Sequence, residues 1–299
     1  MAFARAAPPD RTAAVRRVLM TLLVANVAVV GAKLGIGLVS RSLAVLGDAL
    51  HSSVDALNNV LALVIVGLAS KAPDEDHPYG HGKFETLGAL AIVGFMSITC
   101  FELIRDAFGR LATSRPAPVL SDEQLAVLVA TLAVNVVVAW YENRRGQELE
   151  SDLLLADAAH TRADVFITIG VVVGMLLARR GIWWADPALA LLIAGVIVRI
   201  AYRIFQRAVP VLVDERALPD TAIRTLAEGV NGVMSAYGIR SRGGGSGGGG
   251  GSHLRYAEVT IAVDKNANVA AAHAIADQVE DRLKRELRIN EVTVHVEPC

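Results

Sequence analysis

The sequence predicts an all-α bundle of six transmembrane helices followed by a small α+β domain. Hydrophobic residues make up 53% of the 299 residues, a share typical of a chain that crosses a membrane several times. Six apolar stretches are each long enough to span the ~30 Å hydrocarbon core of a bilayer. Residues 209–299 contain no such stretch and are soluble in character.

The six predicted spans lie within residues 17–208, after a predicted cytoplasmic tail over residues 1–16. No signal peptide is expected, because Arg16 and Arg17 lead directly into a full-length span. Lysines and arginines are more frequent in the tail, after the last span and in the second and fourth connections than in the connections on the opposite side, which predicts that both termini are cytoplasmic. The predicted spans are Val18–Val39, Leu43–Ala69, Thr86–Phe108, Leu120–Trp140, Leu153–Ala178 and Trp184–Ile204.

Residues 209–299 predict a cytoplasmic domain with the element order α-β-β-α-β. The strands are predicted from alternating apolar residues, and the longer helix from a strongly amphipathic pattern. Asp220 is the predicted N-cap of the first helix. This order is that of a two-layer, ferredoxin-like α+β domain. The predicted elements are Thr221–Val230, Val233–Arg242, His253–Val263, Val269–Leu287 and Glu291–Val296.

Three other features of the chain give little information about its function. Residues 243–252 are only glycine and serine, as in an engineered flexible linker or a low-complexity hairpin loop. The formal net charge of −1 gives no reason to expect a nucleic-acid partner. Cys100 and Cys299 form no metal or redox motif.

An eight-residue pattern, Asp-Ala-x-His-x-x-x-Asp, occurs at residues 48–55 and again at residues 157–164. Histidine and aspartate four residues apart lie on one face of a helix. Two such helices side by side would bring together His51, Asp55, His160 and Asp164, a tetrahedral set that suits zinc. Ionisable residues at membrane depth are costly, which marks them as functional candidates.

The leading aspartates of the two copies, Asp48 and Asp157, are expected on opposite sides of this site. The second and fifth spans run in opposite directions, so Asp48 would lie one turn outward of His51 and Asp157 one turn inward of His160. They either guide ions or protons to the site or serve as polar packing at a vestibule.

The connection after the second span contains a further candidate metal set, Asp74, His77 and His81, within a Pro-Asp-Glu-Asp-His-Pro-Tyr-Gly-His-Gly-Lys segment. Six spans, the paired His-x-x-x-Asp motifs, this loop and a ferredoxin-like tail together resemble the cation diffusion facilitator family. The resemblance covers nearly the whole chain, apart from its first residues and the glycine tract.

The resemblance implies a homodimeric, proton-coupled exporter of divalent metal from the cytoplasm. His51, Asp55, His160 and Asp164 match the family's transport site, and Asp74, His77 and His81 match its loop site. Lys83 and Asp214 match positions that form charge pairs between the subunits of family members.

The cytoplasmic domain departs from the family's two-metal site. His273, His295 and Glu297 match three of its ligand positions, with glutamate in place of aspartate. Tyr237 and Thr260 occupy two positions that are histidine in some members. These differences put a complete two-metal site in doubt.

The sequence therefore predicts a zinc/proton antiporter in a bacterial inner membrane, with no enzymatic activity. Its partners would be divalent metal, protons, the lipid bilayer and a second copy of the chain. Ligand type leaves Cd²⁺, Fe²⁺, Co²⁺ and Ni²⁺ open as cargo. A metal sensor or scaffold without transport is an alternative, and so is a membrane zinc hydrolase, although four protein ligands leave no open position on the metal.

Overall fold

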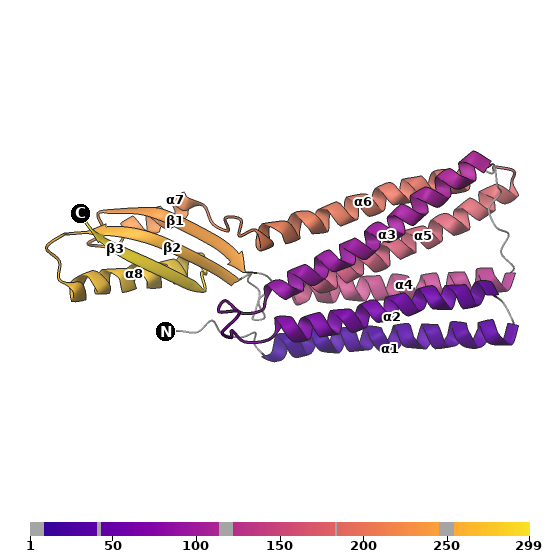
Figure 1. Cartoon of the computed structure of the whole chain (residues 1–299), viewed down its shortest axis with the longest axis horizontal. Coiled ribbons are helices and arrows are strands. Elements are labelled where there is room, and N and C mark those ends of the chain that lie inside the picture. Colours follow the sequence, from indigo (N-terminus) through magenta and orange to yellow (C-terminus); the bar gives the residue numbers. More distant parts are fainter. Residues whose placement is uncertain (1–8, 41–42, 114–121, 183, 245–253) are drawn as a thin grey trace. The chain divides into compact units, whose positions relative to one another are not determined.

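The computed structural model describes residues 9–40, 43–113, 122–182, 184–244 and 254–299 (Figure 1). The chain divides into two compact units. The helical unit consists of Pro9–Leu68 and Leu87–Ala208. Among the described residues, the C-terminal unit consists of Ala69–Thr86 and Val209–Cys299.

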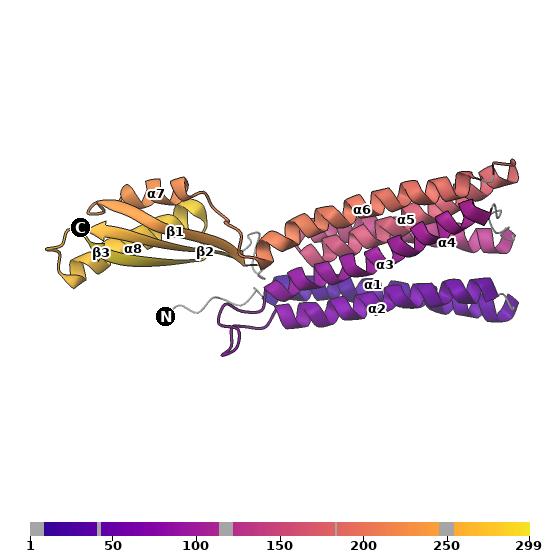
Figure 2. The same cartoon turned by 45° about the horizontal axis from the view of Figure 1, so that its top comes forward.

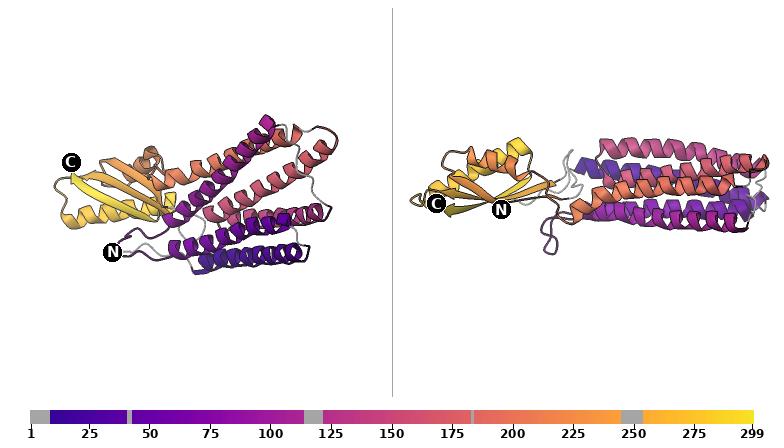
Figure 3. Two further views of the ribbon diagram at one scale, coloured as in Figure 1. Left: turned by 45° about the vertical axis from the view of Figure 1, so that its right-hand side comes forward. Right: turned by 90° about the horizontal axis from the view of Figure 1, so that it is seen from above.

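Long helices α1 to α6 form the helical unit, and α3 and α6 spread away from α1 and α2 toward one end of it (Figures 1 and 3). In the described part of the chain, five of them are long and apolar enough to cross a membrane, which agrees with five of the predicted spans. The other helix, α5, has 28 residues, but charged side chains interrupt its first half. Its crossing of the membrane stays a prediction. The helices are α1 (Pro9–Ser40), α2 (Leu43–Ala69), α3 (Lys83–Thr113), α4 (Asp122–Glu148), α5 (Asp152–Arg179) and α6 (Ala185–Leu212).

Helix α1 begins before the predicted tail ends at residue 16. Arg11, in its first turns, donates from Nε to the carbonyl oxygen of Leu149 at 2.7 Å and from a terminal nitrogen to that of Glu150 at 3.0 Å. These carbonyls follow the last turn of α4, where backbone oxygens have no partner within the helix. The contact orders residues that sequence hydropathy alone assigns to the tail.

Side chains of α2 and α5, the two helices that carry the repeated motif, meet at Gly88 of α3. A Cβ atom added at Gly88 of α3 would lie 2.8 Å from Ile65 Cγ2 and 3.0 Å from Leu153 Cδ1. Only glycine therefore fits this contact without a shift of its neighbours. The buried Ser151 directly precedes α5, and its hydroxyl accepts a hydrogen bond from Leu154 N at 3.3 Å, as an N-cap residue does.

The C-terminal unit is an α+β domain with a three-stranded sheet in the order β1-β2-β3 (Figure 2). Strands β1 and β2 are antiparallel, and β2 and β3 are parallel. Alternate residues of β2 (Ala257, Val259 and Ile261) share one core with residues of both helices, so the helices cover one face of the sheet. The elements are α7 (Asp220–Glu228), β1 (Ser235–Gly244), β2 (Leu254–Val263), α8 (Val269–Leu287) and β3 (Glu291–Pro298), in the predicted order.

One predicted helix cap in this unit is wrong, and the glycine tract is only partly described. Asp220 is the first residue of α7, and Pro219 occupies the N-cap position without a side-chain hydrogen bond. The helix begins at Asp220, one residue earlier than predicted, because the backbone is extended at Pro219 and already helical at Asp220. Gly243 and Gly244 pair with β2 in the sheet, and residues 245–253 lie outside the described residues.

Candidate metal centre

A cluster of three ionisable side chains joins α2 and α5 inside the helical unit. Asp55 comes from α2, and His160 and Asp164 come from α5. One ligand atom of each lies within 4.8 Å of the others. His160 Nε2 is 3.6 Å from Asp55 Oδ1 and 3.7 Å from Asp164 Oδ2. Packing of the two helices therefore brings together residues that are more than a hundred positions apart in the sequence.

The geometry of this cluster fits a bound metal ion. His160 Nε2 is buried and has no hydrogen-bond partner among the described residues. Its distances to the two carboxylates are too long for hydrogen bonds. Zinc bound at ~2.0–2.1 Å from each ligand in a tetrahedral shell separates its ligands by about 3.3 Å, close to the observed spacing. The side chains of His160, Asp55 and Asp164 are 11%, 27% and 15% exposed, so the cluster is shielded and still reachable.

The other members of the repeated motif are described to different extents. His51 and Asp48 belong to α2, but their side chains lie outside the described part of the structure. On the helix backbone His51 lies one turn before Asp55. Asp157 of α5 is buried, and its Oδ2 has no hydrogen-bond partner among the described residues.

Two buried charged residues that hydrogen-bond to sequence neighbours of His51 and His160 were not singled out from the sequence. Glu142 of α4 is 1% exposed and accepts a hydrogen bond from Thr161 Oγ1 at 2.9 Å, next to His160. Lys33 of α1 is 4% exposed and donates to Ser52 Oγ at 2.8 Å, next to His51. Both could have been identified as charged residues inside or just after predicted apolar spans, because an unpaired charge at membrane depth is energetically costly.

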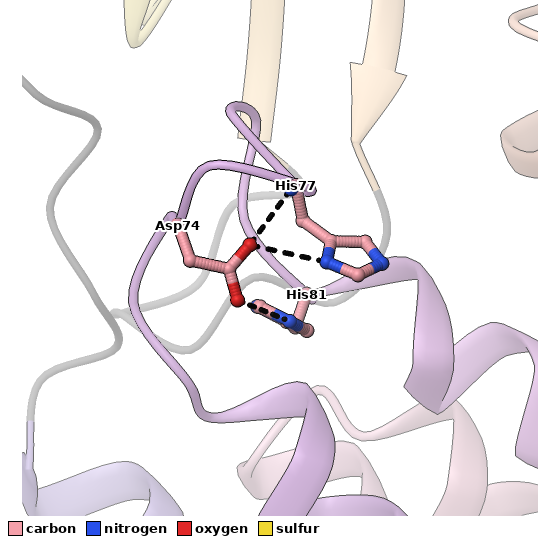
Figure 4. Close-up of side chains that lie close together, drawn as sticks. All are labelled: Asp74, His77 and His81. Carbon is pink, nitrogen blue, oxygen red and sulfur yellow. Dashed lines mark hydrogen bonds and ion pairs between the residues drawn. The ribbon is translucent and has the colours of Figure 1, made fainter.

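A second cluster lies in the connection between α2 and α3 and consists of Asp74, His77 and His81 (Figure 4). Asp74 Oδ1 accepts hydrogen bonds from the backbone N of His77 at 2.7 Å and lies 3.1 Å from His77 Nδ1. Asp74 Oδ2 lies 3.3 Å from His81 Nε2. Gly80, at φ +82°, turns the chain between the two histidines in a conformation that favours glycine.

Local contacts hold this loop cluster in place. The His81 ring is 6% exposed and stacks on Phe84 with centroids 5.7 Å apart. The hydrogen bond from the His77 backbone lowers the pKa of Asp74, and the two imidazoles lower it further. Asp74 is therefore a carboxylate at neutral pH. Two imidazoles and one carboxylate form a ligand set that suits zinc.

The predicted charge pair of Lys83 and Asp214 forms within one chain, in the C-terminal unit. Lys83 Nζ lies 2.8 Å from Asp214 Oδ1, and Arg242 lies 3.5 Å from the other carboxylate oxygen. Burial alone raises the pKa of Asp214, but the Lys83 hydrogen bond and the charges of Lys83 and Arg242 lower it overall. The Arg242 guanidinium also lies 4.0 Å from the ring centroid of Tyr79, a cation–π contact that the sequence did not indicate.

Of the predicted ligands of the cytoplasmic domain, His295 and Glu297 lie close together, but no cluster of three potential ligands includes them or His273 in the described chain. His273 is 77% exposed and lies 3.7 Å from Asp277, one turn along α8. His295 is 68% exposed and lies 3.5 Å from Glu297 on β3. Glu297 also accepts a hydrogen bond from Tyr237. Neither of the two clusters found among the described residues includes these side chains, so a metal site here stays a prediction.

Comparisons with known proteins cover nearly the whole chain. Residues 19–213 match the cation efflux transmembrane domain, and residues 219–299 match the cytoplasmic domain of cation efflux proteins. The chain is 28% identical to the manganese efflux system protein MneS of Bacillus subtilis over 89% of each chain. It is 26% identical to the manganese efflux system protein MneP of the same organism, over 95% of this chain and 96% of the relative. It is 29% identical to the cation-efflux pump FieF of Shewanella oneidensis, over 87% and 86%.

Proposed function

Because the chain belongs to the cation diffusion facilitator family, we propose that this integral membrane protein exports a divalent metal ion through the cluster of Asp55, His160 and Asp164. The observation that supports this proposal is the cluster itself, in which a buried imidazole nitrogen without a hydrogen-bond partner among the described residues lies beside two carboxylates. His51, one turn before Asp55 on α2, is the proposed fourth ligand. Two carboxylates balance the charge of a divalent cation, which lowers the cost of holding it at membrane depth.

Zinc is the proposed cargo. Two imidazoles and two carboxylates suit zinc and neighbouring transition metals, whereas magnesium and calcium prefer oxygen ligands. The two Bacillus subtilis relatives are named as manganese efflux proteins, which makes manganese the main competitor. Carboxylates are acceptable ligands for manganese, but the histidines shift the preference toward zinc. Cd²⁺, Fe²⁺, Co²⁺ and Ni²⁺ are further candidates.

Protons are the proposed counter-ions. Imidazole titrates near neutral pH, so protons compete with metal for His51 and His160. Release of metal on one side of the membrane would then accompany proton binding, as the helices alternate between inward and outward access. Asp157, which is buried on α5 one turn from His160, is a proposed member of the ion or proton path together with Asp48.

The remaining predictions form part of the same proposal. The transmembrane domain would comprise residues 17–208 with six spans, including α5, and residues 209–299 would form the cytoplasmic domain of a homodimer in a bacterial inner membrane. The Asp74, His77 and His81 cluster would hold a metal that braces the loop. A sensor without transport has no need of an intramembrane ligand set, and a hydrolase needs an open metal position, so transport is favoured over both.

The test is a metal-uptake panel in vesicles made with the purified protein. Zinc, manganese, cadmium, cobalt, nickel and iron(II) are offered with and without a pH gradient. We expect zinc transport that depends on the gradient and is accompanied by proton movement, and we expect Asp55→Ala to abolish it. If manganese is transported faster than zinc, manganese is the cargo instead of zinc. Transport that ignores the gradient and moves no protons would refute antiport, and no transport of any metal would favour the sensor.

A further inference from the structure

A cavity of about 400 Å³ lies in the helical unit between α4, α5 and α6, at the end where α4 stops and α5 starts. None of the residues of the metal cluster on α2 and α5 lines it. Part of its wall is apolar and is formed by Leu155, Ile200 and Ile204. The polar side chains that line it are Asn143, Gln147, Asp152, Arg162, Arg203 and Arg207.

The polar part of this wall is rich in positive charge. Three guanidinium groups and one carboxylate line the cavity. Arg203 and Arg207 are one turn apart on α6 and so share a face of that helix. In the part of the chain that the structure describes, neither makes an ion pair or a side-chain hydrogen bond. Unpaired cations beside the membrane favour an anionic partner.

Arg162 is held in a fixed orientation toward the same cavity. Its Nε donates to the carbonyl oxygen of Ala158 at 3.1 Å, and one terminal nitrogen donates to Asn143 Oδ1 at 3.2 Å. Its charge also interacts with the buried carboxylate of Glu142. The second terminal nitrogen has no partner among the described residues. A guanidinium with preset orientation suits the oxygens of a phosphate group.

We propose that this cavity binds the phosphate of an anionic phospholipid, with the guanidinium groups of Arg162, Arg203 and Arg207 on the phosphate and an acyl chain along the apolar wall. A phosphate group matches the cationic part of the lining, and only a lipid also uses the apolar part. The bound anion would offset positive charge that otherwise opposes cations at this end of the bundle. With the proposed topology, the bound lipid would belong to the cytoplasmic leaflet of the membrane. Lipid binding itself does not depend on metal transport.

The experiment measures lipid binding to the full-length protein in a non-ionic detergent, without metal. Native mass spectrometry and thermal unfolding are recorded with phosphatidylglycerol, with phosphatidylcholine and with inorganic phosphate. We expect phosphatidylglycerol to bind at least about tenfold more tightly than phosphatidylcholine and to raise the unfolding midpoint. The double variant R203Q/R207Q should lose most of this preference, and R207Q alone should lose part of it.

The matched control is R180Q, which removes the arginine that directly follows the other end of α5 and should bind lipid as the wild type does. The proposal is overturned if R203Q/R207Q keeps the preference or if R180Q loses it equally. It is also overturned if phosphatidylglycerol and phosphatidylcholine bind alike. Displacement of phosphatidylglycerol by millimolar inorganic phosphate would support the phosphate site. If inorganic phosphate raises the unfolding midpoint as much as phosphatidylglycerol does, the ligand is free phosphate and the lipid proposal is overturned. Loss of metal transport in the uptake panel would leave these outcomes unchanged.

Discussion

Replacing Asp164 with asparagine tests whether the α2–α5 cluster binds the cargo through charge. The side chain is 15% exposed, and Oδ2 lies 3.7 Å from His160 Nε2. Asparagine keeps the shape and one oxygen ligand but removes one negative charge. Removing one partner of a buried charge pair costs about 3–5 kcal/mol. Because the site is partly hydrated and the amide oxygen remains as a ligand, we expect a smaller loss of zinc-binding free energy, about 2–3 kcal/mol. That energy corresponds to about 30- to 150-fold weaker zinc binding.

The assay for Asp164→Asn combines calorimetric zinc titration in detergent with zinc flux into vesicles. Asp106→Asn is the matched control, because Asp106 belongs to the same unit, is 60% exposed and pairs only with the neighbouring Arg105 among the described residues. Its zinc affinity should equal that of the wild type. A dissociation constant for Asp164→Asn within threefold of the wild-type value would show that this carboxylate is not a cargo ligand. An equal loss in Asp106→Asn would show a general charge effect instead.

Three further changes test other parts of the structure. Glu142→Ala removes one of the two acceptors near the Thr161 hydroxyl and leaves the backbone oxygen of Asp157 at 3.2 Å, so it should lower the free energy of unfolding by only about 0.5–1.5 kcal/mol, whereas Glu142→Gln keeps both acceptors and should recover most of this loss in thermal unfolding. His81→Ala should lower the bound zinc per chain by one ion, measured by elemental analysis, while the zinc affinity of the intramembrane site is unchanged; an unchanged ratio would show that the loop binds no zinc. The pKa of Asp214 is lower in the folded chain, so its stabilising contribution is complete above the unfolded value of ~3.9 and is lost as pH falls through the folded value. Asp214→Asn should therefore reduce the acid sensitivity of unfolding, followed by circular dichroism between neutral pH and pH ~2, and an unchanged acid profile would contradict this linkage.

Much of the architecture was predictable because its signals are local. Hydropathy over about 20 residues identified five of the spans, and α8 begins and ends as its amphipathic pattern predicted. The N-terminal boundary of α1 was missed because Arg11 is ordered by carbonyl groups at the end of α4. Asp220 was a reasonable cap by residue type, but the backbone of Pro219 decides where α7 starts.

The site was predictable to the level of candidate residues. Spacing placed His and Asp on one face of each of two helices, and the loop motif placed Asp74 near His77 and His81. Spacing within one helix cannot specify how that helix is rotated and shifted against another. The role of Glu142 and the contact of Arg242 with Tyr79 depend on such packing, and so they were not predicted.

The sequence by itself determined that this chain carries two copies of an intramembrane His-x-x-x-Asp motif, because helical periodicity is a local property of the backbone. Only the tertiary structure decided that Asp55 meets His160 and Asp164 within 4.8 Å, while His273 and His295 lie exposed beside separate carboxylates. The physical reason is that the meeting of α2 and α5 depends on side-chain packing between distant segments, including the glycine contact at Gly88.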